Sequence, residues 1–145
     1  MKEAIRLLIV DDRDIIRDSL KLYFTEATGI RVVGEASDGI EALEMIKEND
    51  YDVVLMDLLM PNVNGIDATK SIIKLKPRTK ILANSFSVNP YHIKELIVAG
   101  ASGFIQKDES KSVYIEAIKT LHQGGVFLSD GISKKVYDKV LDYYK

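Results

Sequence analysis

The chain has 145 residues, the usual size of one domain and enough to bury a single hydrophobic core. Apolar residues make up 46% and charged residues 29% of the sequence, as is typical of a soluble globular protein. The formal net charge of -2 provides no electrostatic attraction to nucleic acid or to an anionic membrane. The sequence contains no cysteine, which excludes disulfides and thiolate chemistry.

The N-terminus carries no signal-peptide pattern, because Met1-Lys2-Glu3-Ala4 leads directly into a short strand-like segment. Every apolar stretch is shorter than the ~18 residues that a membrane-spanning helix needs. These features predict a cytoplasmic protein with no membrane partner.

Short apolar runs alternate with segments of helical periodicity along most of the chain. The runs cover residues 5–10, 31–36, 52–57, 80–84 and 102–106. Strands that alternate with helices favour parallel pairing through right-handed crossovers, and runs as apolar as Val53-Val54-Leu55 suit strands covered on both faces. The alternation predicts a doubly wound α/β domain over residues 1–125.

Helices are predicted between these runs from apolar residues at three- and four-residue spacing. The first is expected to end at Gly29, and its apolar face is Ile16, Leu20, Tyr23, Phe24 and Ala27. The next three are expected from Ser37 or Asp38 to Asn49-Asp50, from Asn64-Gly65 to before Pro77, and from Asn89-Pro90 to Gly100. The fifth ends at Gly124-Gly125, and its apolar face is Tyr114, Ala117, Ile118 and Leu121.

The pattern changes after Gly125, where Val126-Phe127-Leu128 leads into a further segment with helical periodicity. Its apolar positions are Ile132, Val136, Val140 and Tyr144. This spacing predicts an extra C-terminal helix within a linker of residues 126–145. A sequence that ends at Lys145, inside this helix, is expected for the N-terminal part of a longer protein, and a stand-alone domain is the alternative.

Two of the apolar runs end in aspartates. Asp57 follows Val53-Val54-Leu55-Met56, and Asp11-Asp12 follows the run at 5–10. Ligands of doubly wound folds bind beyond the carboxyl ends of the strands, so the three carboxylates are expected to converge. Converging carboxylates need a cation, and an all-oxygen cluster suits Mg²⁺, with the backbone carbonyl of Leu59 and waters as further ligands. The alternative is that Asp12 caps a helix and Asp57 caps a turn.

Two further strand ends carry polar groups, the Ser85 hydroxyl and the Lys107 ammonium. Together with Mg²⁺ these groups could neutralise a phosphoryl group, which is the main requirement of phosphoryl transfer. Asp57 is then the natural nucleophile and would form an acyl phosphate. Taken singly, Ser85 is also explained as a strand-end hydroxyl and Lys107 as a solvated lysine.

With these residues in place, the chain resembles the receiver domain of two-component response regulators over residues 4 to about 125. The matching segments are Asp11-Asp12, Asp57 to Gly65 with Met60-Pro61, Ser85, Gly100-Ala101-Ser102-Gly103-Phe104, and Lys107. The resemblance implies a (βα)5 flavodoxin-like fold with a parallel five-stranded sheet of order 2-1-3-4-5. It also implies a signalling domain, which is not an enzyme.

The resemblance assigns a role to each matching residue. Asp57 becomes the phosphoacceptor from a sensor histidine kinase, and Asp11 and Asp12 hold Mg²⁺. Lys107 contacts the phosphoryl group. Ser85 is the switch hydroxyl and Phe104 the aromatic switch, for which a plain core phenylalanine is the alternative.

A weaker similarity concerns the output of the signal. The segment from Ala99 to Asp108, followed by Gly124-Gly125-Val126-Phe127-Leu128-Ser129, is similar to regulators with a C-terminal LuxR-type helix-turn-helix. In the switch that the receiver resemblance implies, phosphorylation changes the surface of helix 4, strand 5 and helix 5, which would favour a homodimer or release a downstream domain, with helix 1, helix 4, helix 5 and the terminal helix all possible dimer faces. DNA would be bound only through a C-terminal domain beyond these residues, and a stand-alone receiver acting through protein-protein interaction is the alternative.

Three residues depart from the commoner receiver pattern. Phe86 places a bulky ring after the switch serine, and Leu59 cannot orient an attacking water as an amide side chain could. Both predict slow self-dephosphorylation. Asn84 is polar within an apolar strand, which suggests a partly exposed edge.

Other protein classes fit the residues less well. A magnesium-dependent aspartyl phosphatase resembling the haloacid dehalogenase group needs an aspartate two residues after the nucleophile, where this chain has Leu59. A nucleotide-binding switch would need a GxxxxGK[ST] loop or a GxGxxG fingerprint, and the sequence has neither. A degenerate receiver is disfavoured by the intact set of candidate site residues.

Overall fold

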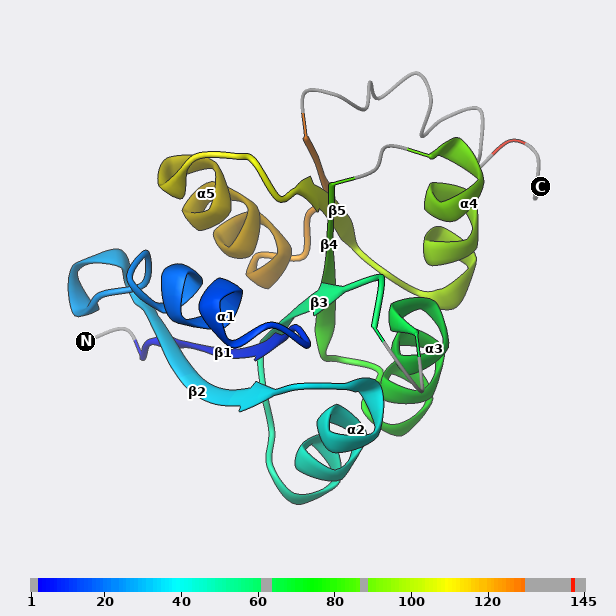
Figure 1. Cartoon of the computed structure of the whole chain (residues 1–145), viewed down its shortest axis with the longest axis horizontal. Coiled ribbons are helices and arrows are strands. Elements are labelled where there is room, and N and C mark those ends of the chain that lie inside the picture. Colours follow the sequence, from blue (N-terminus) through cyan, green and yellow to red (C-terminus); the bar gives the residue numbers. More distant parts are fainter. Residues whose placement is uncertain (1–2, 61–63, 87–88, 130–141, 143–145) are drawn as a thin grey trace.

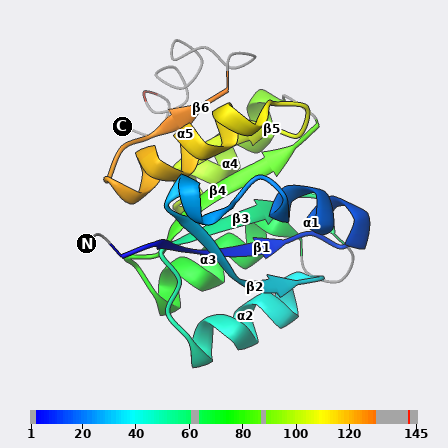
Figure 2. The ribbon, with the colours of Figure 1, turned by 90° about the vertical axis from the view of Figure 1, so that its left-hand side faces the viewer.

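The computed structural model, which describes residues 3–60, 64–86, 89–129 and 142, consists of a parallel sheet with helices on both faces (Figures 1 and 2). The strands are β1 (Ile5–Val10), β2 (Ile30–Ala36), β3 (Val53–Asp57), β4 (Lys80–Ser85), β5 (Gly103–Gln106) and β6 (Phe127–Leu128). Their order in the sheet is β2-β1-β3-β4-β5-β6, and every pair is parallel. The predicted order of the first five strands is therefore confirmed.

The helices form one layer on each face of the sheet (Figure 1). They are α1 (Asp14–Lys21), α2 (Gly39–Glu48), α3 (Gly65–Leu75), α4 (Pro90–Ala99) and α5 (Lys111–His122). α1 and α5 cover one face, and α2, α3 and α4 cover the other. This arrangement is the predicted doubly wound fold.

Alternation along β3 explains the two layers. Val53 and Leu55 belong to the core beneath α1 and α5, whereas Val54 and Met56 belong to the core beneath α2 and α3. All four are buried, as expected of a central strand covered on both faces. Asp57, the last residue of this strand, therefore lies at the carboxyl ends of the strands, where ligands of this fold bind.

Polar caps begin three of the helices where the sequence predicted them. The side chain of Asp38 accepts a hydrogen bond from the Glu41 amide at the start of α2, and Asn64 accepts one from Asp67 at the start of α3. Asn89 accepts one from Tyr91 at the start of α4. In the described part of the chain, no helix has the length and hydrophobicity needed to cross a membrane.

The first helix is shorter than predicted. α1 ends at Lys21 instead of reaching Ala27, and a 3-10 turn (Glu26–Thr28) follows before Gly29, which has a φ of 77°. The Thr28 hydroxyl donates to the Thr25 carbonyl at 2.6 Å, a local bond that competes with helix continuation. Phe24 is still buried in the core beneath α1, while Ala27 is exposed.

The sheet has one strand more than predicted. β6 lies along the outer edge of β5, where the Ser129 amide donates to the Phe104 carbonyl at 3.1 Å. Gly124, with a φ of 89°, turns the chain back toward the sheet after α5. β6 therefore pairs with backbone groups that an edge strand would leave open. The helix predicted from Ile132 to Tyr144 lies outside the described residues.

Candidate functional site

Two neighbouring strands bring three carboxylates together. β1 pairs with β3, so Asp11, which follows β1, lies beside Asp57 at the end of β3. Asp11 and Asp57 are buried, whereas Asp12 is exposed. One oxygen from each of the three carboxylates lies within 4.8 Å of the others. The predicted convergence is confirmed.

Lys107 reaches this cluster from the loop after β5. Its side chain is 5% exposed, and its ammonium lies 3.0 Å from Asp11 Oδ2 and 3.0 Å from Asp57 Oδ1. The alternative of a solvated lysine is wrong. The ammonium therefore bridges the two buried carboxylates.

Ser85 lies at the end of β4, between the strands that carry Asp57 and Lys107. It is buried, and its backbone carbonyl accepts a hydrogen bond of 3.0 Å from the Lys107 amide. The preceding residue, Asn84, pairs with Asp57 across the sheet. Sheet pairing thus holds the ends of β3, β4 and β5 in register around the cluster.

Phe104 does not join the carboxylate cluster. Its ring is buried in a separate core with Leu58 and Ala83 beneath α4, and its backbone pairs with Ala83. This position is that of a core phenylalanine, and its part in switching remains a prediction.

Leu59 lies at the mouth of the site. Its backbone amide donates a hydrogen bond of 3.3 Å to Asp57 Oδ1, and the residue is 70% exposed. The side chain offers no hydrogen-bonding group to a water that approaches Asp57.

Burial raises the pKa of the Asp57 carboxyl above its ordinary value, although the hydrogen bond and charge of Lys107 oppose this effect. The neighbouring charge of Asp11 raises it further. The three carboxylates outnumber the two nearby cations, the Lys107 ammonium and the Arg13 guanidinium, whose Nε lies 3.5 Å from Asp11 Oδ1. Because all the donors are oxygens, the cluster fits a hard divalent cation.

The expectation that Asn84 lies at a partly exposed edge is wrong. The residue is 2% exposed, and its side-chain carbonyl accepts a hydrogen bond of 3.1 Å from the Tyr114 hydroxyl of α5. Burial raises the pKa of Tyr114 above its ordinary value. A buried tyrosine hydroxyl needs a hydrogen-bond partner. The tyrosine on the predicted core face of the fifth helix was therefore the one sequence signal that Asn84 is buried as its acceptor.

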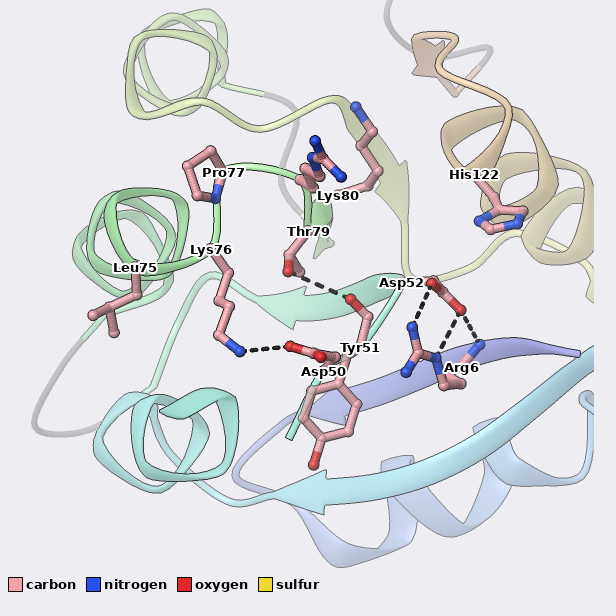
Figure 3. Close-up of a pocket in the computed structure, with 11 residues that line it drawn as sticks. Arg6, Asp50, Tyr51, Asp52, Leu75, Lys76, Pro77, Thr79, Lys80 and His122 are labelled. Carbon is pink, nitrogen blue, oxygen red and sulfur yellow. Dashed lines mark hydrogen bonds and ion pairs between the residues drawn. The ribbon is translucent and has the colours of Figure 1, made fainter. Parts of the chain in front are cut away.

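A cavity of about 620 Å³ lies at the opposite ends of the strands and includes none of the candidate site residues (Figure 3). Arg6 binds Asp52 through two side-chain hydrogen bonds, and Lys76 binds Asp50. Burial alone would raise the pKa of Asp52, but the hydrogen bonds and charge of Arg6 hold it below its ordinary value. The first pair joins β1 to the residue before β3, and the second joins the segments that follow α2 and α3.

Comparison with known proteins identifies the family. The family model of the response regulator receiver domain matches residues 7–119. The chain is 33% identical over 127 residues to the transcriptional regulatory protein DegU of Brevibacillus brevis, covering 88% of this chain and 54% of DegU. It is 45% identical over 113 residues to the chemotaxis protein CheY of Thermotoga maritima, covering 78% of this chain and 93% of CheY.

Solved structures agree with this result. A two-component response regulator of the LuxR family from Aurantimonas sp. SI85-9A1 superposes with a TM-score of 0.87 at 28% identity, covering 96% of this chain and 99% of that chain. The similarity to LuxR-family receivers that the sequence suggested is thereby confirmed. The chain belongs to the family of response regulator receiver domains.

Proposed function

We propose that this receiver domain accepts a phosphoryl group from a sensor histidine kinase onto Asp57. The observation that carries the proposal is the Lys107 ammonium, which lies 3.0 Å from Asp57 in a site that contains two further carboxylates. An Asp57 oxygen attacks the phosphorus, and the bond from phosphorus to the donor imidazole nitrogen breaks. The products are an acyl phosphate on Asp57 and the free histidine of the kinase.

Asp11, Asp12, Asp57 and the backbone carbonyl of Leu59 would hold Mg²⁺, which supplies positive charge to the transferring phosphoryl group. Lys107 neutralises a second phosphoryl oxygen from the side of β5. The Asp57 carboxylate is oriented by the Lys107 ammonium and the Leu59 amide, so the nucleophile needs little rearrangement before transfer.

The added charge would then act on a two-state element formed by Ser85 and Phe104. Ser85 moves to hydrogen-bond the phosphoryl group, Phe104 moves into the space released, and the surface of α4, β5 and α5 changes shape. That changed surface would favour a homodimer.

The output is proposed to be transcriptional control in the cytoplasm. The chain spans 54% of DegU, which is named a transcriptional regulatory protein. Residues 1–125 would be the receiver and residues 126–145 a linker toward a DNA-binding domain. The alternative, a stand-alone receiver, is supported by the 93% coverage of CheY.

Phosphoryl uptake tests the proposal. The protein is incubated with acetyl phosphate and Mg²⁺, and its intact mass is measured with and without a chelator. A mass increase of one phosphoryl group that depends on Mg²⁺ is expected. An unchanged mass, or steady turnover of a phosphomonoester such as p-nitrophenyl phosphate, would contradict a phosphoacceptor and favour an enzyme.

The phosphorylated protein is expected to lose its phosphoryl group slowly, and Leu59→Asn should shorten its lifetime by about tenfold or more. The exposed Leu59 side chain cannot position water, whereas an amide at this mouth position can. The decay of the phosphorylated mass after removal of the donor measures the lifetime. A Leu59→Ala variant shows whether any change comes from loss of the leucine side chain or from gain of the amide. A wild-type lifetime shorter than that of Leu59→Asn would contradict the prediction.

A further inference from the structure

Arg13 occupies a position that the local structure does not favour. It is the N-cap residue of α1, where short polar side chains are preferred, and its side chain makes no capping hydrogen bond. A positive charge is also unfavourable at the positive end of a helix dipole. The helix therefore offers no reason for an arginine here, and such local conflicts are expected at functional sites.

Its side chain lies instead over the carboxylate site. Arg13 Nε is 3.5 Å from Asp11 Oδ1, and the backbone amide of Arg13 donates to the same oxygen at 2.9 Å. The side chain is 45% exposed, compared with 5% for Lys107. Arg13 thus stands at the mouth of the site, whereas Lys107 stands at its floor.

Phe86 connects these two cations. The centre of its ring lies 5.7 Å from the Arg13 guanidinium carbon and 5.5 Å from Lys107 Nζ. Both distances are within the range of cation–π attraction. Phe86 is 63% exposed, so its ring is not held in place by a hydrophobic core. The ring therefore lies between the cation at the mouth of the site and the cation at its floor.

The charges at the site suggest what Arg13 does. With a bound divalent cation, Lys107 and the three carboxylates balance, so Arg13 adds a surplus positive charge. Phosphorylation replaces the single charge of Asp57 by a group of about -2, which adds about one negative charge. Arg13 is placed to compensate for that additional charge.

We propose that Arg13 is a second cation for the phosphoryl group, and that the Phe86 ring positions it over Asp57. This inference rests on the proposed function of Asp57. A cation in this role must attract the phosphoryl group and repel the metal ion. A residue with a merely structural role would weaken the binding of both.

The test measures the two affinities separately. Calorimetry gives the affinity for Mg²⁺ alone, and fluorine NMR at saturating Mg²⁺ gives the affinity for beryllofluoride, an analogue of the acyl phosphate. Arg13→Gln is expected to bind Mg²⁺ about three- to tenfold more tightly and beryllofluoride about three- to tenfold more weakly. Arg13→Lys should restore much of both affinities.

Arg78→Gln is the matched control, because it removes the same charge at the cavity on the opposite end of the sheet. It should leave both affinities near wild type. Two variants test the ring. Phe86→Leu is expected to change both affinities in the same directions as Arg13→Gln, whereas Phe86→Tyr, which keeps an aromatic ring, is expected to keep both affinities near wild type.

Unchanged affinities in Arg13→Gln, or a weakening of both, would overturn the inference while leaving Asp57 as the phosphoacceptor. A wild-type protein that takes up no phosphoryl group and binds no beryllofluoride would overturn the proposed function together with this inference.

Discussion

An Asp57→Asn variant is expected to take up no phosphoryl group and, without Mg²⁺, to be more stable than the wild-type protein. The amide is not a nucleophile for phosphorus. It also removes a charge that the fold disfavours, because burial raises the pKa of Asp57 despite the opposing effect of Lys107. Lys107 keeps its ion pair with Asp11 in the variant. The free energy of unfolding near neutral pH is therefore expected to be higher in the variant than in the wild-type protein.

The pH dependence gives the sign of this effect. A carboxyl with a higher pKa in the folded than in the unfolded protein binds its proton more tightly when folded. Its contribution to stability is present below the unfolded pKa and is lost as pH rises through the raised folded pKa. The advantage of Asp57→Asn should therefore grow from acid toward neutral pH.

Thermal unfolding in a chelator, measured at several pH values, checks the Asp57→Asn prediction. Asp52→Asn is a control of opposite sign at the other end of the same sheet, since Arg6 holds the pKa of Asp52 below its ordinary value. That variant should lose stability at neutral pH. Saturating Mg²⁺ should stabilise wild type more than Asp57→Asn. An Asp57→Asn protein that is less stable than wild type in the chelator would contradict the prediction.

Lys107→Ala is expected to be strongly destabilised and to accept a phosphoryl group at least about 100-fold more slowly. The ammonium bridges two carboxylates that are buried, with side chains 2% and 3% exposed. Its removal leaves both without this counter-charge, and breaking a buried pair in this way costs about 3–5 kcal/mol. Loss of a preorganised cation at the phosphoryl group lowers the rate.

Urea unfolding and the initial rate of phosphoryl uptake measure the two effects. A double variant, Lys107→Ala with Asp57→Asn, separates pairing from side-chain packing, because it removes one of the orphaned carboxylates. It should be more stable than Lys107→Ala alone. Equal stability of the single and double variants would show that the bridge between Lys107 and Asp57 contributes little.

Much of the fold and of the site could be predicted because both depend on short segments. The apolar run of β3 and its terminal Asp57 are adjacent in sequence, and parallel pairing places the ends of neighbouring strands together. Lys107 could be placed by the same rule, since it directly follows β5.

The predictions that failed concern one helix end, one short strand and one buried side chain, and the last two depend on contacts between distant segments. β6 has two residues, too few for a periodic pattern, and it exists through its bonds to β5. α1 ends at Lys21 although the apolar spacing continues to Ala27, and Phe24 is buried from a turn that follows the helix. The burial of Asn84 depends on Tyr114, which lies 30 positions away on another element.

The position of Arg13 over the site could not have been predicted from its neighbours either. Its contacts come from two segments, Asp11 before α1 and Phe86 after β4, and the same Phe86 ring also lies near Lys107 after β5. Local sequence gave one signal, an arginine where a helix prefers a short polar cap. That signal indicates a misfit without indicating the partner.

Chemical trapping of the phosphorylated residue tests the role of Asp57 most directly. Borohydride reduces an acyl phosphate to an alcohol and so converts a phosphorylated aspartate to homoserine. After incubation with acetyl phosphate and Mg²⁺, reduction and peptide mass spectrometry should locate homoserine at position 57. Homoserine at Asp11 or Asp12, or its absence from a protein that carries a phosphoryl group, would contradict Asp57 as the phosphoacceptor.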